Sequence, residues 1–261
     1  LNLAPHPWKI LKCAETGIVF LENPPGYEAL KEDFAWEKTY ESEVNKRRAD
    51  EPIRYKISSF LKDFRLKVLK RNKIKEIAKK EILKIKESNS IELLDVGCAD
   101  GGALEKIISE LPQTYHSKCI PNGIEISAAL AKIAREKAKR GKWIHNNAVD
   151  GMLEFDNDYF DVVILSSFLE HEIEPVQLLK NTLIKLKSHG SVIIKVPNFA
   201  SWNRHIRKEK WCGFRHPDHV NYFTPDTLKE TALRSGFSKF SMKLLDKQPL
   251  SDSMYAVLKK S

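Results

Sequence analysis

Short apolar segments alternate with amphipathic segments between residues 90 and 197, and this alternation constrains the fold more than any other feature of the sequence. The apolar segments have the length of strands, and the segments between them repeat apolar residues at helical spacing. Strands that alternate with helices in this way form a parallel sheet with helices on both faces. We expect strands at Ile91–Val96, Gly123–Ile126 (the end of a longer strand), Trp143–Ala148, Asp161–Ser166 and Ser191–Val196, and helices at Gly102–Leu111, Ala128–Arg140 and Val176–Lys187.

The segments after residue 197 extend this pattern. Residues 198–222 are rich in Trp, Arg, His and Pro, which predicts a loop. A helix is expected at Thr224–Ser235, because Thr224 is a suitable N-cap, Pro225 suits the first turn and Gly236 suits the C-cap. The last two strands, expected at Phe237–Leu245 and Met254–Leu258, complete an α/β fold with a seven-stranded, mostly parallel sheet.

The first 88 residues differ from the rest, so we predict two parts, residues 1–88 and 89–261. A stretch punctuated by Pro and Gly ends at residues 24–26, and helical patterns follow at about residues 27–47 and 52–87. We expect the first part to form a small β-element and a helical cap. The second part would carry the sheet and a substrate loop.

Charge is concentrated in one segment of the chain. The sequence holds 44 Lys+Arg and 35 Asp+Glu, a net charge of +9, and 42% of its residues are hydrophobic, which excludes a disordered or fibrous chain. Lys62–Lys86 alone holds eleven basic and three acidic residues. Apolar residues recur there at helical spacing, which predicts a surface helix with solvated lysines; a face that contacts RNA or anionic lipid is the alternative.

Cysteine content and hydropathy predict the cellular setting. The four cysteines are scattered without a Cys-x-x-Cys pair, so we expect neither a disulfide framework nor a closed zinc site. No apolar run approaches the ~20 residues of a membrane span, and no signal peptide is visible. The expected protein is therefore cytoplasmic and has no transmembrane segment.

A glycine turn joins the first predicted strand to the first predicted helix at residues 95–101. Gly97 and Gly101 allow the backbone to turn tightly and to approach a ligand closely. The helix that starts at Gly102 presents free N–H groups to a negative group. Asp95 would repel a phosphate, so its position favours a ligand that carries an ammonium group.

Two further acids follow the next two predicted strands. Glu125 ends the second strand, where a carboxylate can accept both hydroxyls of a ribose. Asp150 follows the third strand and can accept from an exocyclic amine such as the adenine N6. Each acid alone is equally well explained as a helix cap or a turn residue. The ordered set with the glycine turn predicts a site for an adenosine that bears an amino-acid tail.

With these motifs, the chain resembles the class I S-adenosylmethionine-dependent methyltransferases over about residues 90–260. Residues 95–101 resemble the first motif of that family, residues 160–171 its fourth-strand motif and residues 186–191 the turn before its fifth strand. Ala99 stands where the family often has glycine. The resemblance implies a Rossmann-like fold and S-adenosyl-L-methionine as cofactor. The cofactor-binding residues that it implies are Asp95, Gly97, Cys98, Ala99, Gly101, Glu125, Ile126, Asp150, Gly151 and Ser166.

Residues 12–25 are similar to the short zinc ribbon that precedes many bacterial methyltransferases of this branch. That ribbon uses Cys-x-x-Cys-Gly, whereas here Cys13 is followed by Thr16 at the second thiolate position. One thiolate cannot hold zinc, so we expect a degenerate, metal-free remnant. In such enzymes the following helices, which here contain Trp36, Tyr40 and Tyr55, cap the cofactor or substrate.

Histidines are the predicted catalytic residues. Methyl transfer from a sulfonium requires alignment of the nucleophile and, for a hydroxyl, removal of its proton, which histidine can accept near neutral pH. His216 and His219 lie in the loop after the fifth strand, and His171 follows the fourth strand. We predict His219 as the first candidate base and His171 as the second. The alternatives are that His171 lines the cofactor and that His219 packs the loop.

A metal site is the alternative chemistry for this region. Glu170, His171, His216 and His219 could hold a cation that lowers the pKa of a hydroxyl. Similar pairs occur in small-RNA 2′-O-methyltransferases and in ubiquinone-pathway O-methyltransferases, with the motif Glu-x-x-Glu-His. Ser167 replaces the first Glu of that motif here, so we predict no metal.

The composition of the loop of residues 198–222 indicates which kind of methyl acceptor the protein would bind. It combines basic and aromatic residues: Arg204, Arg207, Lys208, Lys210 and Arg215 with Trp202, Trp211, Phe214 and Tyr222. Such residues stack on sugars or bases and bind anions, or else pack as a lid. We predict O-methylation of a sugar or another polar or anionic small molecule or glycan. An RNA-modifying methyltransferase and a non-catalytic S-adenosylmethionine-binding protein are the alternatives; Asp95 and the absence of G-x-G-x-x-G disfavour a nicotinamide dehydrogenase.

Overall fold

A computed structural model of the chain describes residues 8–32, 45, 48–49, 52–63, 72–86 and 88–260. Its main sheet has seven strands in the order β5-β4-β3-β6-β7-β10-β9. These strands are β3 (Ile91–Val96), β4 (Cys119–Glu125), β5 (Trp143–His145), β6 (Phe160–Ser166), β7 (Leu186–Pro197), β9 (Lys239–Ser241) and β10 (Ser253–Lys259). Strands β3 to β7 run parallel, and β10 is antiparallel to β7 and β9. The predicted sheet is confirmed.

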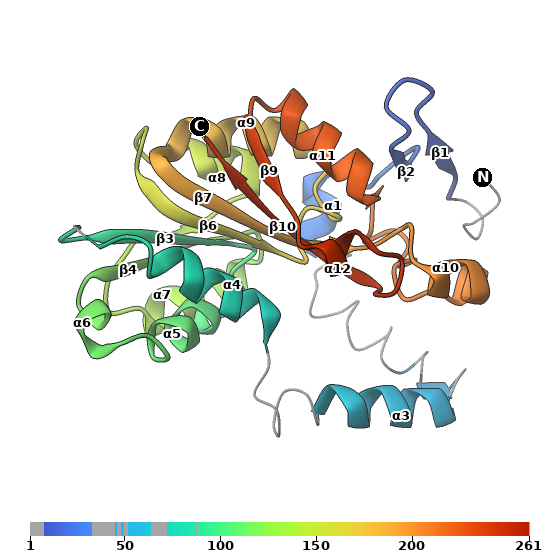
Figure 1. Cartoon of the computed structure of the whole chain (residues 1–261), viewed down its shortest axis with the longest axis horizontal. Coiled ribbons are helices and arrows are strands. Elements are labelled where there is room, and N and C mark those ends of the chain that lie inside the picture. Colours follow the sequence, from blue (N-terminus) through green and yellow to red (C-terminus); the bar gives the residue numbers. More distant parts are fainter. Residues whose placement is uncertain are drawn as a thin grey trace.

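Helices cover both faces of this sheet (Figure 1). One face carries α4 (Lys73–Ile82), α5 (Gly102–Ile108) and α7 (Ala128–Lys137), and the other carries α8 (Ala148–Leu153), α9 (Pro175–Lys185) and α11 (Pro225–Arg234). Leu93 and Val162 are buried in the core under α4 and α5, whereas Leu94 and Val163 belong to the core under α8, α9 and α11. Two cores form because successive side chains of a strand point to opposite faces.

A second sheet joins the amino-terminal part to the segment 198–222. Strands β1 (Ile10–Lys12) and β2 (Val19–Leu21) form an antiparallel hairpin, and β2 pairs with β8 (Asn221–Tyr222). The apolar side chains of these segments share one core, which contains Ile10, Val19, Leu21, Phe199, Trp211, Phe214, Val220 and Tyr222. The small β-element expected before residue 27 is therefore present, and it braces the segment that carries the loop histidines.

The expected helical cap is partly described. Helices α1 (Tyr27–Glu32) and α3 (Pro52–Asp63) lie in it, and Tyr55 belongs to α3, whereas Trp36 and Tyr40 fall outside the described residues. Within the basic segment, residues 64–71 also fall outside them. Over residues 8–32, 45, 48–49, 52–63, 72–86 and 88–260, no helix combines the length and apolar character needed to cross a bilayer.

Helix α4 lies within the described part of the basic segment, which is residues 62–63 and 72–86, and it packs on the main sheet. Ala78 and Ile82 are buried in the core beneath it. On its outer side, Lys75 and Lys79 contact Glu110 of the turn after α5, at 2.7 and 2.9 Å. The amphipathic helix predicted from the spacing is confirmed here, and part of its positive charge is neutralised within the chain.

Several predicted boundaries are wrong for local reasons. The strand expected at residues 143–148 ends at His145, because the Asn147 side chain caps α8 by accepting the Asp150 N–H at 2.9 Å. The strand expected at residues 237–245 is only β9, and Leu244 begins the short helix α12 (Leu244–Lys247). The predicted loop 198–222 contains α10 (Trp202–Arg207) and the 3-10 helix η2 (Lys208–Lys210). Helices α5, α7 and α9 end two or three residues before their predicted carboxyl-terminal ends.

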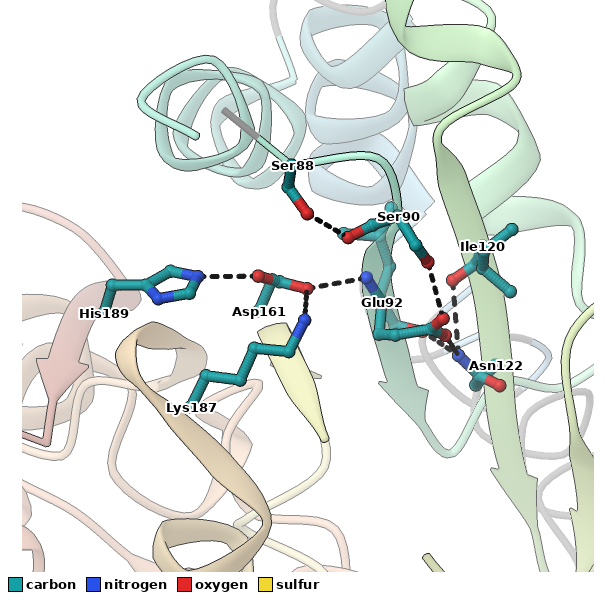
Figure 2. Close-up of polar contacts among 9 residues, drawn as sticks. Ser88, Ser90, Glu92, Ile120, Asn122, Asp161, Lys187 and His189 are labelled. Atoms are coloured by element: carbon teal, nitrogen blue, oxygen red, sulfur yellow. Dashed lines mark hydrogen bonds and ion pairs between the residues drawn. The ribbon is translucent and has the colours of Figure 1, made fainter. Parts of the chain in front are cut away.

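A buried carboxylate joins three strands at the amino-terminal edge of the sheet (Figure 2). Asp161 of β6 accepts hydrogen bonds from Lys187 Nζ at 2.6 Å and His189 Nε2 at 2.7 Å, both on β7, and from the Glu92 N–H of β3 at 2.8 Å. The Asn122 amide of β4 donates to the Glu92 carboxylate at 2.9 Å. This network stabilises the sheet at the edge opposite to the predicted site.

Candidate active site

A cavity opens at the carboxyl ends of β3, β4 and β6, where the sequence places its motifs. Its volume of about 200 Å³ is many times the ~10–15 Å³ that one water molecule requires, so it can hold an organic ligand. The cavity is lined by Tyr27, Gly97, Ala99, Ile124, Glu125, Ile126, Leu130, Asn146, Asn147, Ala148, Ser167, Phe168, His171, Glu172 and Asp218. Five predicted site residues are in this wall, namely Gly97, Ala99, Glu125, Ile126 and His171.

The glycine turn forms one side of the cavity. Gly97 and Gly101 have φ angles of +72° and +77°, in the left-handed region that favours glycine. A Cβ on Gly97 would also lie 2.5 Å from the ring of Phe168. Ala99, which stands in place of a glycine, has a φ of +49°, and its N–H donates to Glu125 Oε2 at 2.8 Å. The turn thus holds alanine in an uncommon conformation with the help of Glu125.

Two buried carboxylates, Asp95 and Glu125, lie beside this turn. Besides Ala99, Glu125 accepts the N–H of Ser127 through Oε1 at 2.9 Å, so one side chain orders both the glycine turn and the start of α7. Burial, together with the nearby Glu125 charge, raises the pKa of Asp95 to about 8. At neutral pH Asp95 is therefore mainly protonated, and a bound cation would favour its charged form.

Asp150 lies in the first turn of α8 and not in a loop after the strand. Its carboxylate accepts from Asn147 Nδ2 at 2.7 Å, and its side chain is not among the cavity-lining residues. Instead, Asn146, Asn147 and Ala148 line this part of the wall. Asn147 is thus the N-cap of α8, and Asp150 is an acidic residue in the first turn of that helix.

Four other predicted cofactor residues, Cys98, Gly101, Gly151 and Ser166, lie next to the cavity wall but do not line the cavity. Cys98 is buried, and burial raises the pKa of its thiol. Gly151 lets α8 approach β4, because a Cβ there would lie 2.7 Å from Ile124. Gly101 is the N-cap of α5, and Ser166 ends β6. These residues position the lining side chains without themselves lining the cavity.

Several residues that line the cavity were not among the predicted site residues. The Tyr27 hydroxyl of α1 donates to Glu172, a residue 145 positions later in the chain, and burial raises the pKa of the Glu172 carboxyl. No local signal could have revealed that contact. Phe168 and Ser167 lie within the fourth-strand motif, and Asn147 has the residue type of an N-cap, so these positions could have been found.

Two of the three predicted histidines come together at the cavity. The rings of His171 and His219 have centroids 4.6 Å apart and planes at 89°. His171 Nδ1 lies 2.9 Å from the Asp218 carbonyl oxygen, and His219 Nδ1 lies 2.8 Å from that of Gly213. Because a carbonyl oxygen only accepts, each Nδ1 donates, and each neutral ring keeps a lone pair on Nε2. Burial lowers the pKa of His171 to about 4, so this ring is neutral at pH 7.

Glu170 joins these two histidines. Its carboxylate is buried, and among the described residues no hydrogen-bond donor contacts its Oε2. One ligand atom each from Glu170, His171 and His219 lies within 4.8 Å of the others. Burial raises the pKa of Glu170 to about 7. A carboxylate with two imidazoles can accept protons or hold a divalent cation, so the donor set fits both chemistries weighed from the sequence.

His216 lies apart from this cluster. Its ring stacks on Phe214 with centroids 5.8 Å apart and planes at 22°, and its Nδ1 lies 3.2 Å from the Tyr222 hydroxyl. Trp211, Phe214 and Tyr222 are buried in the core shared with the hairpin, whereas Trp202 is exposed. Three of the four loop aromatics therefore pack the segment, as the lid alternative predicted, and do not offer a surface for an acceptor.

Comparison with known proteins agrees with this architecture. The family described as "Methyltransferase domain" matches residues 54–241. The mitochondrial ubiquinone biosynthesis O-methyltransferase of Candida albicans is 29% identical in an alignment of length 140, which covers 51% of this chain and 41% of that protein. The matched stretch therefore spans less than half of that relative.

Solved structures show the same fold. The CurJ carbon methyltransferase has a TM-score of 0.54 and 19% identity over 72% of this chain and 54% of its own. The DszA carbon methyltransferase has a TM-score of 0.55 and 14% identity over 71% and 53%. The [4+2]-cyclase SpnF has a TM-score of 0.50 and 16% identity over 70% and 79%. At these identities the likeness concerns the fold alone.

The parallel sheet, the glycine turn and the cavity at the strand ends define a Rossmann-like α/β protein with a cofactor site. The family match covers well over half of the chain, so the chain belongs to the methyltransferase-domain family. Its cofactor is S-adenosylmethionine, as the resemblance of its motifs implied.

Proposed function

We propose that this chain transfers the methyl group of S-adenosylmethionine to a hydroxyl of a polar small molecule or glycan. The observation that carries the proposal is the neutral His171 in the cavity wall, with its Nδ1 held by a backbone carbonyl and its Nε2 lone pair available. The O-methyltransferase named among the relatives supports an oxygen acceptor.

The cofactor would occupy the glycine-turn side of the cavity. Glu125 would accept the ribose hydroxyls, and Asp95 would neutralise the ammonium group. Asn146 and Asn147, which line the wall, would face the adenine side together with Ile126. The sulfonium needs no acid catalyst, so the remaining task of the protein is to align the acceptor and to remove its proton.

His171 and His219 would share that proton removal. His171 lines the cavity, whereas His219 is not among the lining residues but contacts the His171 ring. The hydroxyl proton would pass to a histidine Nε2 as the oxygen bonds to the methyl carbon and the carbon–sulfur bond breaks. The products would be the methyl ether, S-adenosylhomocysteine and a proton.

Metal binding is a second candidate role for the same side chains. It is supported by the buried Glu170 Oε2, which no hydrogen-bond donor among the described residues contacts. Glu170, His171 and His219 would hold a divalent cation, and that cation would lower the pKa of the acceptor hydroxyl. The two roles differ in a measurable way, because only the second requires metal.

Single-turnover assays with a pool of polar metabolites test the proposal, with methylated products identified by mass spectrometry. We expect His171→Ala and His219→Ala to lower turnover by about 100-fold or more while the cofactor Kd is unchanged. His205→Ala, an exposed histidine outside the cluster, is the control. Wild-type turnover in both cluster variants would refute the role of the histidines. Activity that survives a chelator supports proton acceptance, and activity lost to a chelator and restored by Mg²⁺ or Zn²⁺ supports the cation.

A further inference from the structure

Large apolar side chains are exposed on α10 and on the connection that contains α12. Trp202 and Ile206 of α10 are 59% and 77% exposed, and Leu244, Leu245 and Leu250 are 73%, 72% and 66% exposed. Across the part of the chain that the structure describes, the three most exposed large apolar side chains, Ile206, Leu244 and Leu245, all belong to these two segments. Single exposed apolar residues are ordinary, but such a concentration marks an interaction surface.

The two segments are adjacent in space. The Trp202 N–H donates to the Pro249 carbonyl at 2.8 Å, and Asn203 Nδ2 contacts Asp252 Oδ2 at 2.5 Å. Trp202 and Ile206 are four residues apart, so they share one side of α10. Figure 1 also places α10 beside the connection that follows α12.

The same segments carry positive charge. Lys208 and Lys210 of η2 and Lys243 and Lys247 around α12 are exposed, and none of the four forms an ion pair with another described residue. Glu209 is the one exposed acid in residues 201–210 and 243–250 as the structure describes them. We call these segments together the apolar–basic face; it consists of Trp202, Ile206, Lys208, Lys210, Lys243, Leu244, Leu245, Lys247 and Leu250.

We propose that the apolar–basic face docks on the surface of an anionic phospholipid bilayer. Interfacial segments place Trp, Ile and Leu at the boundary between headgroups and acyl chains, while lysines contact anionic headgroups. The core of a protein–protein interface is depleted of lysine, so a protein partner matches this composition less well. RNA also matches it less well, because the aliphatic side chains of Ile206 and the leucines cannot stack on bases as aromatic rings do.

The apolar–basic face lies at the same edge of the sheet as the cavity, and this placement holds whether or not the chain transfers methyl groups. Helix α10 follows the carboxyl end of β7, which is parallel to β6 and ends at the same edge of the sheet. Asp218, a cavity-lining residue, belongs to the same segment 198–222. A docked molecule would therefore hold the cavity edge of the sheet near the lipid headgroups.

Sedimentation of the full chain with vesicles tests this inference. We expect binding to vesicles of phosphatidylcholine with phosphatidylglycerol to exceed binding to phosphatidylcholine alone by about tenfold or more. The double variant Trp202→Ser/Ile206→Ser should lose this binding, and Lys208→Gln/Lys210→Gln should lose the preference for the anionic lipid. Because these side chains are exposed, the variants should keep the thermal unfolding curve of the parent chain. The matched control is Ile184→Ser/Leu233→Ser, which removes exposed apolar side chains from α9 and α11.

A direct contact can be read from tryptophan fluorescence. Lipids brominated near the headgroup should quench part of the emission, and Trp202→Phe should abolish that part. Failure to bind anionic vesicles, or equal weakening by the control variant, would overturn the proposal. Self-association without lipid that Ile206→Ser abolishes would assign the face to a second copy. Salt-sensitive RNA binding lost in Lys208→Gln/Lys210→Gln but kept in Trp202→Ser/Ile206→Ser would assign it to RNA.

Discussion

Replacement of Glu125 by alanine should weaken the glycine turn and the cofactor site together. The carboxylate accepts the N–H groups of Ala99 and Ser127 at 2.8 and 2.9 Å. A hydrogen bond to a charged group contributes about 1.5–3 kcal/mol, and part of this loss is recovered when water reaches the freed N–H groups. We therefore expect the free energy of unfolding to fall by about 2–4 kcal/mol. Loss of the ribose acceptor should raise the cofactor Kd at least tenfold, or about 1.4 kcal/mol.

Urea denaturation and calorimetric titration with S-adenosylmethionine measure these two effects separately. Glu125→Gln retains one acceptor oxygen, but its NH₂ group cannot accept the second N–H, so its stability should lie between those of the parent chain and Glu125→Ala. Glu136→Ala, which changes an exposed carboxylate of α7, is the control. Unchanged cofactor affinity in Glu125→Ala would refute the ribose role, and unchanged stability would refute the role in the turn.

Further predictions concern Asp95, Asp161 and Gly97. Cofactor binding at pH 7 should release about 0.9 proton, because Asp95 with a pKa near 8 is mostly protonated before the ammonium group binds. Calorimetry in buffers of different ionisation enthalpy measures the number of protons released. Asp95→Asn should abolish the release. Since this folded-state pKa exceeds the unfolded value, stability of the free protein should fall as pH rises from about 4 to 8. Asp161→Ala should lower the free energy of unfolding by about 2–4 kcal/mol in urea, with Glu136→Ala in an exposed ion pair as control. Gly97→Ala should lower it by about 2–4 kcal/mol and weaken cofactor binding, because of its positive φ and the Phe168 ring.

Each of these predictions has a result that contradicts it. A binding enthalpy that does not change with the ionisation enthalpy of the buffer would show that no proton is released and that Asp95 is already ionised. An Asp161→Ala variant as stable as Glu136→Ala would show that the strand-edge network adds nothing. Normal stability in Gly97→Ala would show that the turn relaxes around a methyl group.

Local signals predicted the elements well wherever neighbours in the sequence decide them. The strand Ile91–Val96 is confirmed residue for residue, and Thr224 caps α11 as expected, accepting the Thr227 N–H at 3.2 Å. The errors occur where two local signals compete. We expected a strand over residues 143–148, but Asn147 accepts the N–H of Asp150 and a helix begins there.

The sequence by itself determined the sheet, its helical layers and the acids at the strand ends, because strand periodicity and caps depend on residues that are close in the chain. Parallel strands end at one edge, so the approach of Asp95 and Glu125 also followed from the sequence. Only the tertiary structure decided that His171 meets His219 while His216 does not, and that Tyr27 reaches Glu172. Those contacts depend on how distant segments bury their apolar side chains against one another, which no local pattern encodes.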